Sequence, residues 1–150
     1  MKTNSGFTLI EVLIAVVILA GGLLGLAALQ AASLRNNQSA YSRSQATQLA
    51  YDIADKMRAN PEETNKLATS AYVATTTPVA QASCNNTTGC TSALMAQDDL
   101  AQWHANISSA LPGGIGTVTV DAPTRIFTIA ITSDDDHDGT DTIFQTKLQL

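Results

Sequence analysis

The chain has 150 residues, of which 13 are acidic and 8 are lysine or arginine, and its formal net charge is −5. This length is enough for one ordinary domain. The acidic balance argues against broad binding to a phosphate backbone, because such binding needs clustered lysine and arginine. Charge is also unevenly placed, since no charged residue lies between Glu11 and Arg35. The composition therefore indicates an apolar N-terminal segment followed by a small polar body.

Residues 7–29 form an almost uninterrupted apolar run. As a helix this run would be roughly 35 Å long, enough to cross a hydrocarbon core of about 30 Å. It is longer than the apolar core of a secretory signal peptide, and no A-x-A-like cleavage site follows it, so we expect it to be retained. Lys2 precedes the run and Arg35 follows it. This slight bias favours a cytoplasmic N-terminus and a translocated body.

Glu11 is the one ionisable residue inside this run. A charged side chain in a membrane helix costs up to about 3 kcal/mol at the bilayer centre, and such residues are usually paired and functional. No other residue of the run can pair with Glu11, so a partner would have to come from another chain or from a newly made charge. The alternative is that Glu11 lies about one helical turn from the interface and reaches water. The residues alone leave both interpretations open.

Residues 6–11 read Gly-Phe-Thr-Leu-Ile-Glu. This motif, joined to the apolar run, resembles the prepilin motif of type IV pilins and type II secretion pseudopilins. The resemblance implies that a prepilin peptidase removes residues 1–6 by cutting after Gly6, and that the new N-terminal Phe7 is N-methylated. It also implies that Glu11 meets the amine of a neighbouring subunit. The two costly charges would then offset each other and set the axial register.

The helical pattern continues beyond the apolar run, over residues 30–60. No glycine or proline interrupts it before Pro61. Apolar residues recur there at three- and four-residue spacing, which predicts one apolar stripe that the body must cover. The stripe comprises Ala46, Leu49, Ala50, Ile53, Ala54 and Met57. Asp52 and Lys56 have the i,i+4 order that favours an ion pair. The residue before a proline avoids the helical region, so we predict one helix from residue 7 to residue 59.

The end of this helix reads Arg58-Ala59-Asn60-Pro61 after an acidic and basic stretch. It resembles the helix end of the PilV-type minor pilins, also called type IV pilus modification proteins. Residues 100–103 and 111–114 resemble the same subfamily. Major pilins usually have a proline at the depth where this chain has Ala28, which also suggests a minor subunit.

Residues 61–150 are expected to form the globular body. Residues 61–92 are rich in small polar residues and poor in large apolar ones, so they read as a long loop, with a short strand around residues 72–74 as an option. Cys84 and Cys90 lie close together in this loop. A pair of this kind outside the membrane segment indicates one disulfide in an oxidising compartment, and the alternative is two free thiols.

A second helix is predicted over residues 93–111, followed by a break at the glycines after Pro112. Its apolar face would hold Leu94, Met95, Leu100, Trp103, Ile107 and Leu111, with Trp103 in the core. Strands are predicted at 117–120, 125–132 and 142–150, as an antiparallel meander. The residues of the middle strand would alternate, with Phe127, Ile129 and Ile131 on one face. The predicted fold class is α+β, with a long N-terminal helix packed on a small antiparallel sheet, which is the type IV pilin fold.

The residues Asp134, Asp136 and Asp138, followed by Gly139, have the spacing of the first half of a calcium loop. A complete loop of this kind needs a glutamate at its twelfth position, which here is Gln145. The alternative, a solvated hairpin tip, is the interpretation that we favour, so calcium is only a weak candidate and no other cofactor is expected.

No catalytic motif is present, and the chain is expected not to be an enzyme. The leading hypothesis is a PilV-like minor pilin in the bacterial inner membrane, with a single span and a periplasmic body, that later joins the pilus. It would take part in pilus assembly or priming. Its partners would be other minor and major pilins, contacted through the N-terminal helix, the prepilin peptidase and the inner-membrane assembly platform, while nucleic acid is unlikely. The alternatives are a type II secretion pseudopilin and a tip-exposed adhesive or ligand-binding subunit.

Overall fold

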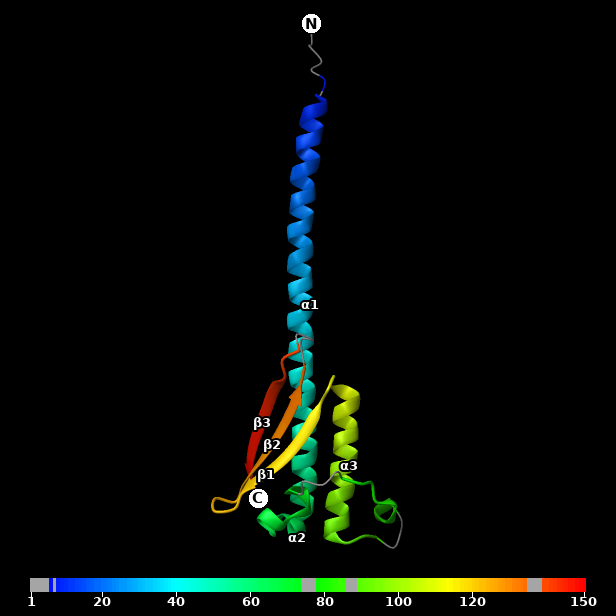
Figure 1. Cartoon of the computed structure of the whole chain (residues 1–150), viewed down its shortest axis with the longest axis vertical. Helices are drawn as coiled ribbons and strands as arrows, with labels where there is room; N and C mark the ends of the chain where they lie inside the picture. Colours follow the sequence, from blue (N-terminus) through cyan, green and yellow to red (C-terminus); the bar gives the residue numbers. More distant parts are fainter. Residues whose placement is uncertain (1–5, 7, 74–77, 86–88, 135–138) are drawn as a thin grey trace. The chain divides into compact units, whose positions relative to one another are not determined.

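The structure of the chain is a computed structural model that describes residues 6, 8–73, 78–85, 89–134 and 139–150 (Figure 1). The long helix α1 (Leu9–Ala59) comes first, and a short α2 (Pro61–Thr64) follows it. Three 3-10 turns, η1 (Leu67–Thr69), η2 (Ala71–Val73) and η3 (Ala82–Asn85), lead to α3 (Ser92–Ala110). The strands β1 (Ile115–Asp121), β2 (Ile126–Ser133) and β3 (Thr142–Gln149) come last.

The chain divides into two compact units, residues 1–37 and residues 38–150. The first unit contains the apolar part of α1, whose described residues are exposed. Helix α1 begins directly after Thr8, whose hydroxyl oxygen accepts a hydrogen bond from the backbone N–H of Glu11 at 3.3 Å. Thr8 thus acts as an N-cap and satisfies one of the N–H groups that a helix start leaves without a partner.

The second unit contains the rest of α1, and there the helix buries the predicted stripe. Ala46, Ala50, Ile53, Ala54 and Met57 are all buried, while Leu49 is partly buried against them. The small alanines allow close approach, and the two large side chains fill the core next to them. The periodicity of the sequence therefore predicted the covered face of the helix correctly.

Helix α3 runs alongside the second half of α1 (Figure 1) and supplies the largest side chain of the core. Trp103 is fully buried, as predicted, and its Nε1 donates to the backbone carbonyl of Leu49 at 2.8 Å. The prediction for Met95 was wrong, because that side chain is 42% exposed and Ala96 is buried in its place. Ala96, Leu100, Trp103 and Ile107 follow one another at four-, three- and four-residue spacing, so Ala96 shares the buried face of α3 and Met95 lies one position off it.

The three strands form one antiparallel sheet in the order β1-β2-β3, as predicted for a meander. Inward-facing Phe127, Ile129 and Ile131 of β2 are buried, and the residues between them are half-buried. Gly116 of β1 lies against α3, and an added Cβ there would be 2.6 Å from the Trp103 ring. A glycine is required at this position because the strand backbone approaches the indole so closely.

The prediction for residues 61–92 needs correction. The described part of this segment holds α2 and three 3-10 turns. In place of the strand that was an option around residues 72–74, residues 71–73 form η2, and residue 74 lies outside the described residues. The physical reason is that side chains take the backbone donors of this segment. The N–H of Ala71 donates to Glu63 at 2.7 Å, and the N–H of Tyr72 donates to Ser70 Oγ at 3.3 Å. Donors used locally do not serve a strand ladder.

Candidate functional site

The first candidate site is the start of α1, where the predicted assembly residues lie. Gly6 is exposed, and Phe7 lies outside the described residues. Glu11 is exposed in the first turn of α1, where a negative charge is favourable because the helix dipole is positive at that end. Among the described helices, α1 is long and apolar enough to cross a membrane by length and composition. The geometry therefore presents one carboxylate on an apolar helix surface.

A second candidate site is a polar cluster, partly buried, where the end of α1 meets α2, η2 and the start of α3. We call it the helix junction, and it consists of Lys56, Asn60, Glu63, Tyr72, Ser92 and Asp99. Asn60 Nδ2 donates to the backbone oxygen of Ser92 at 2.8 Å. Sequence reasoning treated Asn60 only as a helix stop, but its side chain also ties the end of α1 to the start of α3.

Tyr72 lies at the centre of the helix junction and is 1% exposed. Its hydroxyl donates to Asp99 Oδ2 at 2.7 Å, and Lys56 Nζ lies 3.6 Å from the other carboxylate oxygen of Asp99. Lys56 thus reaches across to α3, and the expected pairing with Asp52 on its own helix is replaced by this contact. Burial raises the pKa of Tyr72 above its usual value, and the nearby Asp99 raises it further.

Glu63 is a carboxylate with almost no exposed surface, and it lies at the α2 side of the helix junction. It accepts hydrogen bonds from Lys66, from the backbone of Ala71 and from Ser92 Oγ. Burial by itself raises the pKa of Glu63, but the bonds from Lys66 and Ala71 and the charge of Lys66 outweigh it, so the pKa is lowered overall. The buried charge is therefore compensated, as buried carboxylates usually require.

The two cysteines lie where the loop reaches α3. Cys84 and Cys90 form a disulfide with a Cα–Cα distance of 4.9 Å, as predicted. Next to the disulfide, the N–H of Gln81 donates to Asp98 at 2.6 Å. The disulfide thus joins η3 to the residue two positions before α3, and the hydrogen bond from Gln81 joins the same segment to α3 itself.

Of the predicted acidic loop, Asp134 and Gly139 are described, while Asp136 and Asp138 lie outside the described residues. Asp134 Oδ2 accepts a hydrogen bond from the N–H of Gly139 at 3.3 Å, and Gly139 has a φ of +83°. This contact is typical of a turn. No group of three potential metal ligands occurs among the residues with described positions, and calcium binding stays a prediction.

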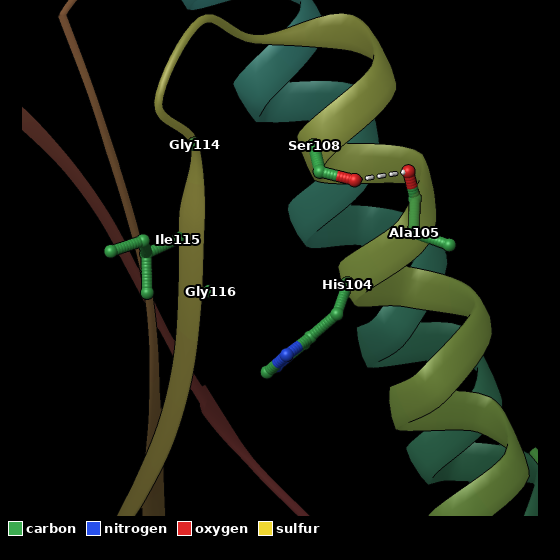
Figure 2. A pocket seen from close by; sticks show the side chains of 6 residues that line it. All are labelled: His104, Ala105, Ser108, Gly114, Ile115 and Gly116. Atoms are coloured by element: carbon green, nitrogen blue, oxygen red, sulfur yellow. Dashed lines mark hydrogen bonds between the residues drawn. The ribbon is translucent and has the colours of Figure 1, made fainter. Parts of the chain in front are cut away.

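A hollow of about 350 Å³ lies between α3 and the start of β1 (Figure 2). His104, Ala105 and Ser108 line it from α3, Gly114 lines it just before β1, and Ile115 and Gly116 line it from β1. The His104 side chain extends from α3 toward β1, and burial lowers its pKa. The Ser108 hydroxyl donates to the backbone oxygen of Ala105 at 2.9 Å, which is a local helix contact.

A long N-terminal apolar helix whose second half packs with a small antiparallel sheet is the type IV pilin fold. Two family models match the chain: the prokaryotic N-terminal methylation motif over residues 1–27, and type IV pilin Tt1218 over residues 28–101. The chain is therefore a type IV pilin-like protein. The Tt1218 match includes the whole helix junction, so this cluster lies in the part of the body that is similar to that family. No curated protein and no solved structure matches the chain.

Proposed function

We propose that this chain is a PilV-like minor pilin that takes part in type IV pilus assembly or priming. It serves a structural role and is not an enzyme. It is made as a single-pass protein of the inner membrane, with a cytoplasmic N-terminus and a periplasmic body. Prepilin peptidase cuts between Gly6 and Phe7, and the new amine on Phe7 is methylated. The processed subunit then passes through the assembly platform into the pilus, beside minor and major pilins.

The observation that carries this proposal is the exposed Glu11 on an exposed apolar helix. The flanking large side chains Ile10 and Val12 are 64% and 54% exposed. A surface this apolar needs either lipid or other apolar helices around it. Glu11 is costly in both environments unless a positive charge comes close. A newly cut N-terminus of a neighbouring subunit supplies such a charge, so cleavage and assembly are coupled in this proposal.

Processing is tested by N-terminal sequencing of protein extracted from the membrane. We expect the mature chain to begin at Phe7 and to carry one methyl group on its amine. A mature chain that still begins with Met1 would contradict the proposal. The deletion strain should lose surface pili while protein secretion stays intact, whereas the opposite result would favour a type II secretion pseudopilin.

The role of Glu11 is tested with Glu11→Ala, and Val12→Ala is the matched control, because it shortens an exposed side chain of the same helix without changing charge. We expect both variants to be processed. Glu11→Ala should be strongly depleted from sheared pili, while Val12→Ala should be incorporated like the parent. Equal incorporation of the two variants would show that Glu11 has no part in assembly.

A further inference from the structure

One face of the sheet is turned away from the core, and we call it the outer face. The register of the three strands arranges its side chains in four rows across β1, β2 and β3. All outer-face residues of β1 and β3 are exposed, and those of β2 are half-buried. The rows are Ile115-Thr132-Ile143, Thr117-Ala130-Gln145, Thr119-Thr128-Lys147 and Asp121-Ile126-Gln149.

The chemistry of the outer face is unusual for an exposed surface of this acidic chain. Its first row holds two isoleucines that are each 60% exposed, Ile115 and Ile143. Its twelve side chains include one acid, Asp121, and one base, Lys147, so the face carries no net charge. The partner that fits must therefore be flat, uncharged overall and apolar at one end, and a second copy of this face has these properties.

We propose that two copies of this chain pack through their outer faces about a twofold axis that runs along β2. Such an axis places β1 of one copy over β3 of the other and keeps each row opposite the same row. Ile115 then lies over Ile143 of the second copy, and the reverse contact forms by symmetry. Asp121 lies one row away from Lys147 of the second copy, which gives two symmetric pairs of opposite charge.

The other in-plane axis, perpendicular to the strands, gives a worse arrangement. It reverses the rows, so that Ile115 lies over Asp121 and Ile143 lies over Gln149 of the second copy. An apolar side chain would then remove a carboxylate from water without giving it an opposite charge, which is costly. The axis along β2 also keeps the second half of α1 similarly oriented in the two copies. The strands run alongside the second half of α1 (Figure 1), so this half points in roughly the same direction in both copies.

The contact must be weak in free solution. The outer face is three strands wide, at about 4.8 Å per strand, and seven residues long, at about 3.4 Å per residue, so its area is roughly 350 Å² in each copy. A stable, specific interface buries about 800 Å² on each partner. Confinement to one membrane raises the effective concentration of two copies, so a contact that is weak in solution can still be populated there. The proposed contact is therefore one that forms between copies held in one membrane.

The test uses the full chain reconstituted in lipid vesicles and a short bis-maleimide cross-linker. Ala130→Cys places a thiol near the twofold axis, while Asn106→Cys, on an exposed position of α3, is the control. The native Cys84 and Cys90 are joined in a disulfide and do not react. We expect cross-linked dimers from Ala130→Cys in clear excess over Asn106→Cys. Equal yields for the two positions would overturn the proposal.

Charge reversal in the Ala130→Cys chain tests the register. Asp121→Lys or Lys147→Asp alone should lower the dimer yield about threefold or more, because exposed pairs of this kind contribute modestly and two are reversed at once. The double reversal should restore the yield. Asp121 also accepts a hydrogen bond from Thr124 at 2.6 Å, and this bond is lost equally in the single and double variants that carry Lys at position 121. Failure of the double reversal to restore the dimer would contradict the proposed pairing.

This contact is independent of the role proposed for Glu11. Adding Glu11→Ala to the Ala130→Cys chain should leave the cross-linking yield unchanged while pilus incorporation falls. If the yield falls with Glu11→Ala as well, the cross-linked species forms through the N-terminal helices, and the outer-face contact is wrong. If the outer-face charges matter and Glu11 does not affect incorporation, the proposed function is wrong and the contact stands.

Discussion

The hydroxyl of Tyr72 offers a direct test of the helix junction. Tyr72→Phe removes the donor to Asp99 and leaves the buried ring in place. Asp99 keeps its contact with Lys56, and Asn60 keeps its hydrogen bond to Ser92, so no other group of the cluster loses all its partners. A hydrogen bond to a charged group contributes about 1.5–3 kcal/mol, and we expect a loss near 2 kcal/mol.

The assay is thermal unfolding of the full chain in detergent, followed by the fluorescence of Trp103, the single tryptophan. For a unit of this size, about 2 kcal/mol corresponds to a decrease in Tm of roughly 6–10 °C. Tyr51→Phe is the matched control, because Tyr51 is 58% exposed on α1, and its Tm should change by less than about 2 °C. If the two variants melt together, the contact between Tyr72 and Asp99 does not stabilise the body.

The same experiment has a pH dependence with a defined sign. The pKa of Tyr72 is higher in the folded state than in the unfolded chain, where it is close to 10. The folded state therefore holds this proton more tightly, and stability decreases as the pH rises above about 10. Tyr72→Phe should abolish this alkaline decrease.

Three further predictions concern the rest of the body. Folding lowers the pKa of Glu63, so its ionised carboxylate stabilises the fold above the pKa of the unfolded chain, and this stabilisation is lost as the pH falls. Glu63→Gln should therefore weaken the acid dependence of Tm below about pH 4.5. Gly116→Ala places a Cβ 2.6 Å from the Trp103 ring and should cost about 1–3 kcal/mol, measured by the same fluorescence melt. Replacing both Cys84 and Cys90 by serine removes the constraint on a short loop and should lower the free energy of unfolding by about 2 kcal/mol. The Tm of this variant should equal that of the parent chain after its disulfide is reduced.

The elements that the sequence predicted are those whose signal is local and periodic. The stripe around Ile53 recurs with the period of a helix, and the middle strand around Ile129 alternates with the period of a strand. Both patterns are written in neighbouring residues, so the order of the residues is enough to assign the buried faces. The burial of Trp103 followed from its place on the apolar face of a second helix.

The helix junction could not be predicted in the same way, because its contacts join residues that are far apart in the chain. Lys56 had a suitable partner four residues away, but the structure pairs it with Asp99 on another helix. Glu63 lies in a segment without periodicity, and nothing nearby in the sequence shows that its carboxylate is buried. An acidic residue two positions after a helix-ending proline is at most a weak signal for such a cluster. The predicted roles of Gly6 and Glu11 rest on a motif, and they remain to be tested by experiment.

Two of the hydrogen bonds that join α1 and its C-terminal end to α3 have a spacing that limits how the helices can slide and rotate. The first anchoring points are Leu49 on α1 and Asn60 directly after it, and those on α3 are Trp103 and Ser92, eleven residues apart in each case. Eleven residues are close to three full turns, so both anchors of each helix point in nearly the same direction. Inserting or deleting one residue between the anchors of either helix would turn one of them about 100° away from its partner. Substitutions of the Leu49 side chain leave this anchor in place, because the acceptor is a backbone carbonyl, whereas a change of helix length displaces it.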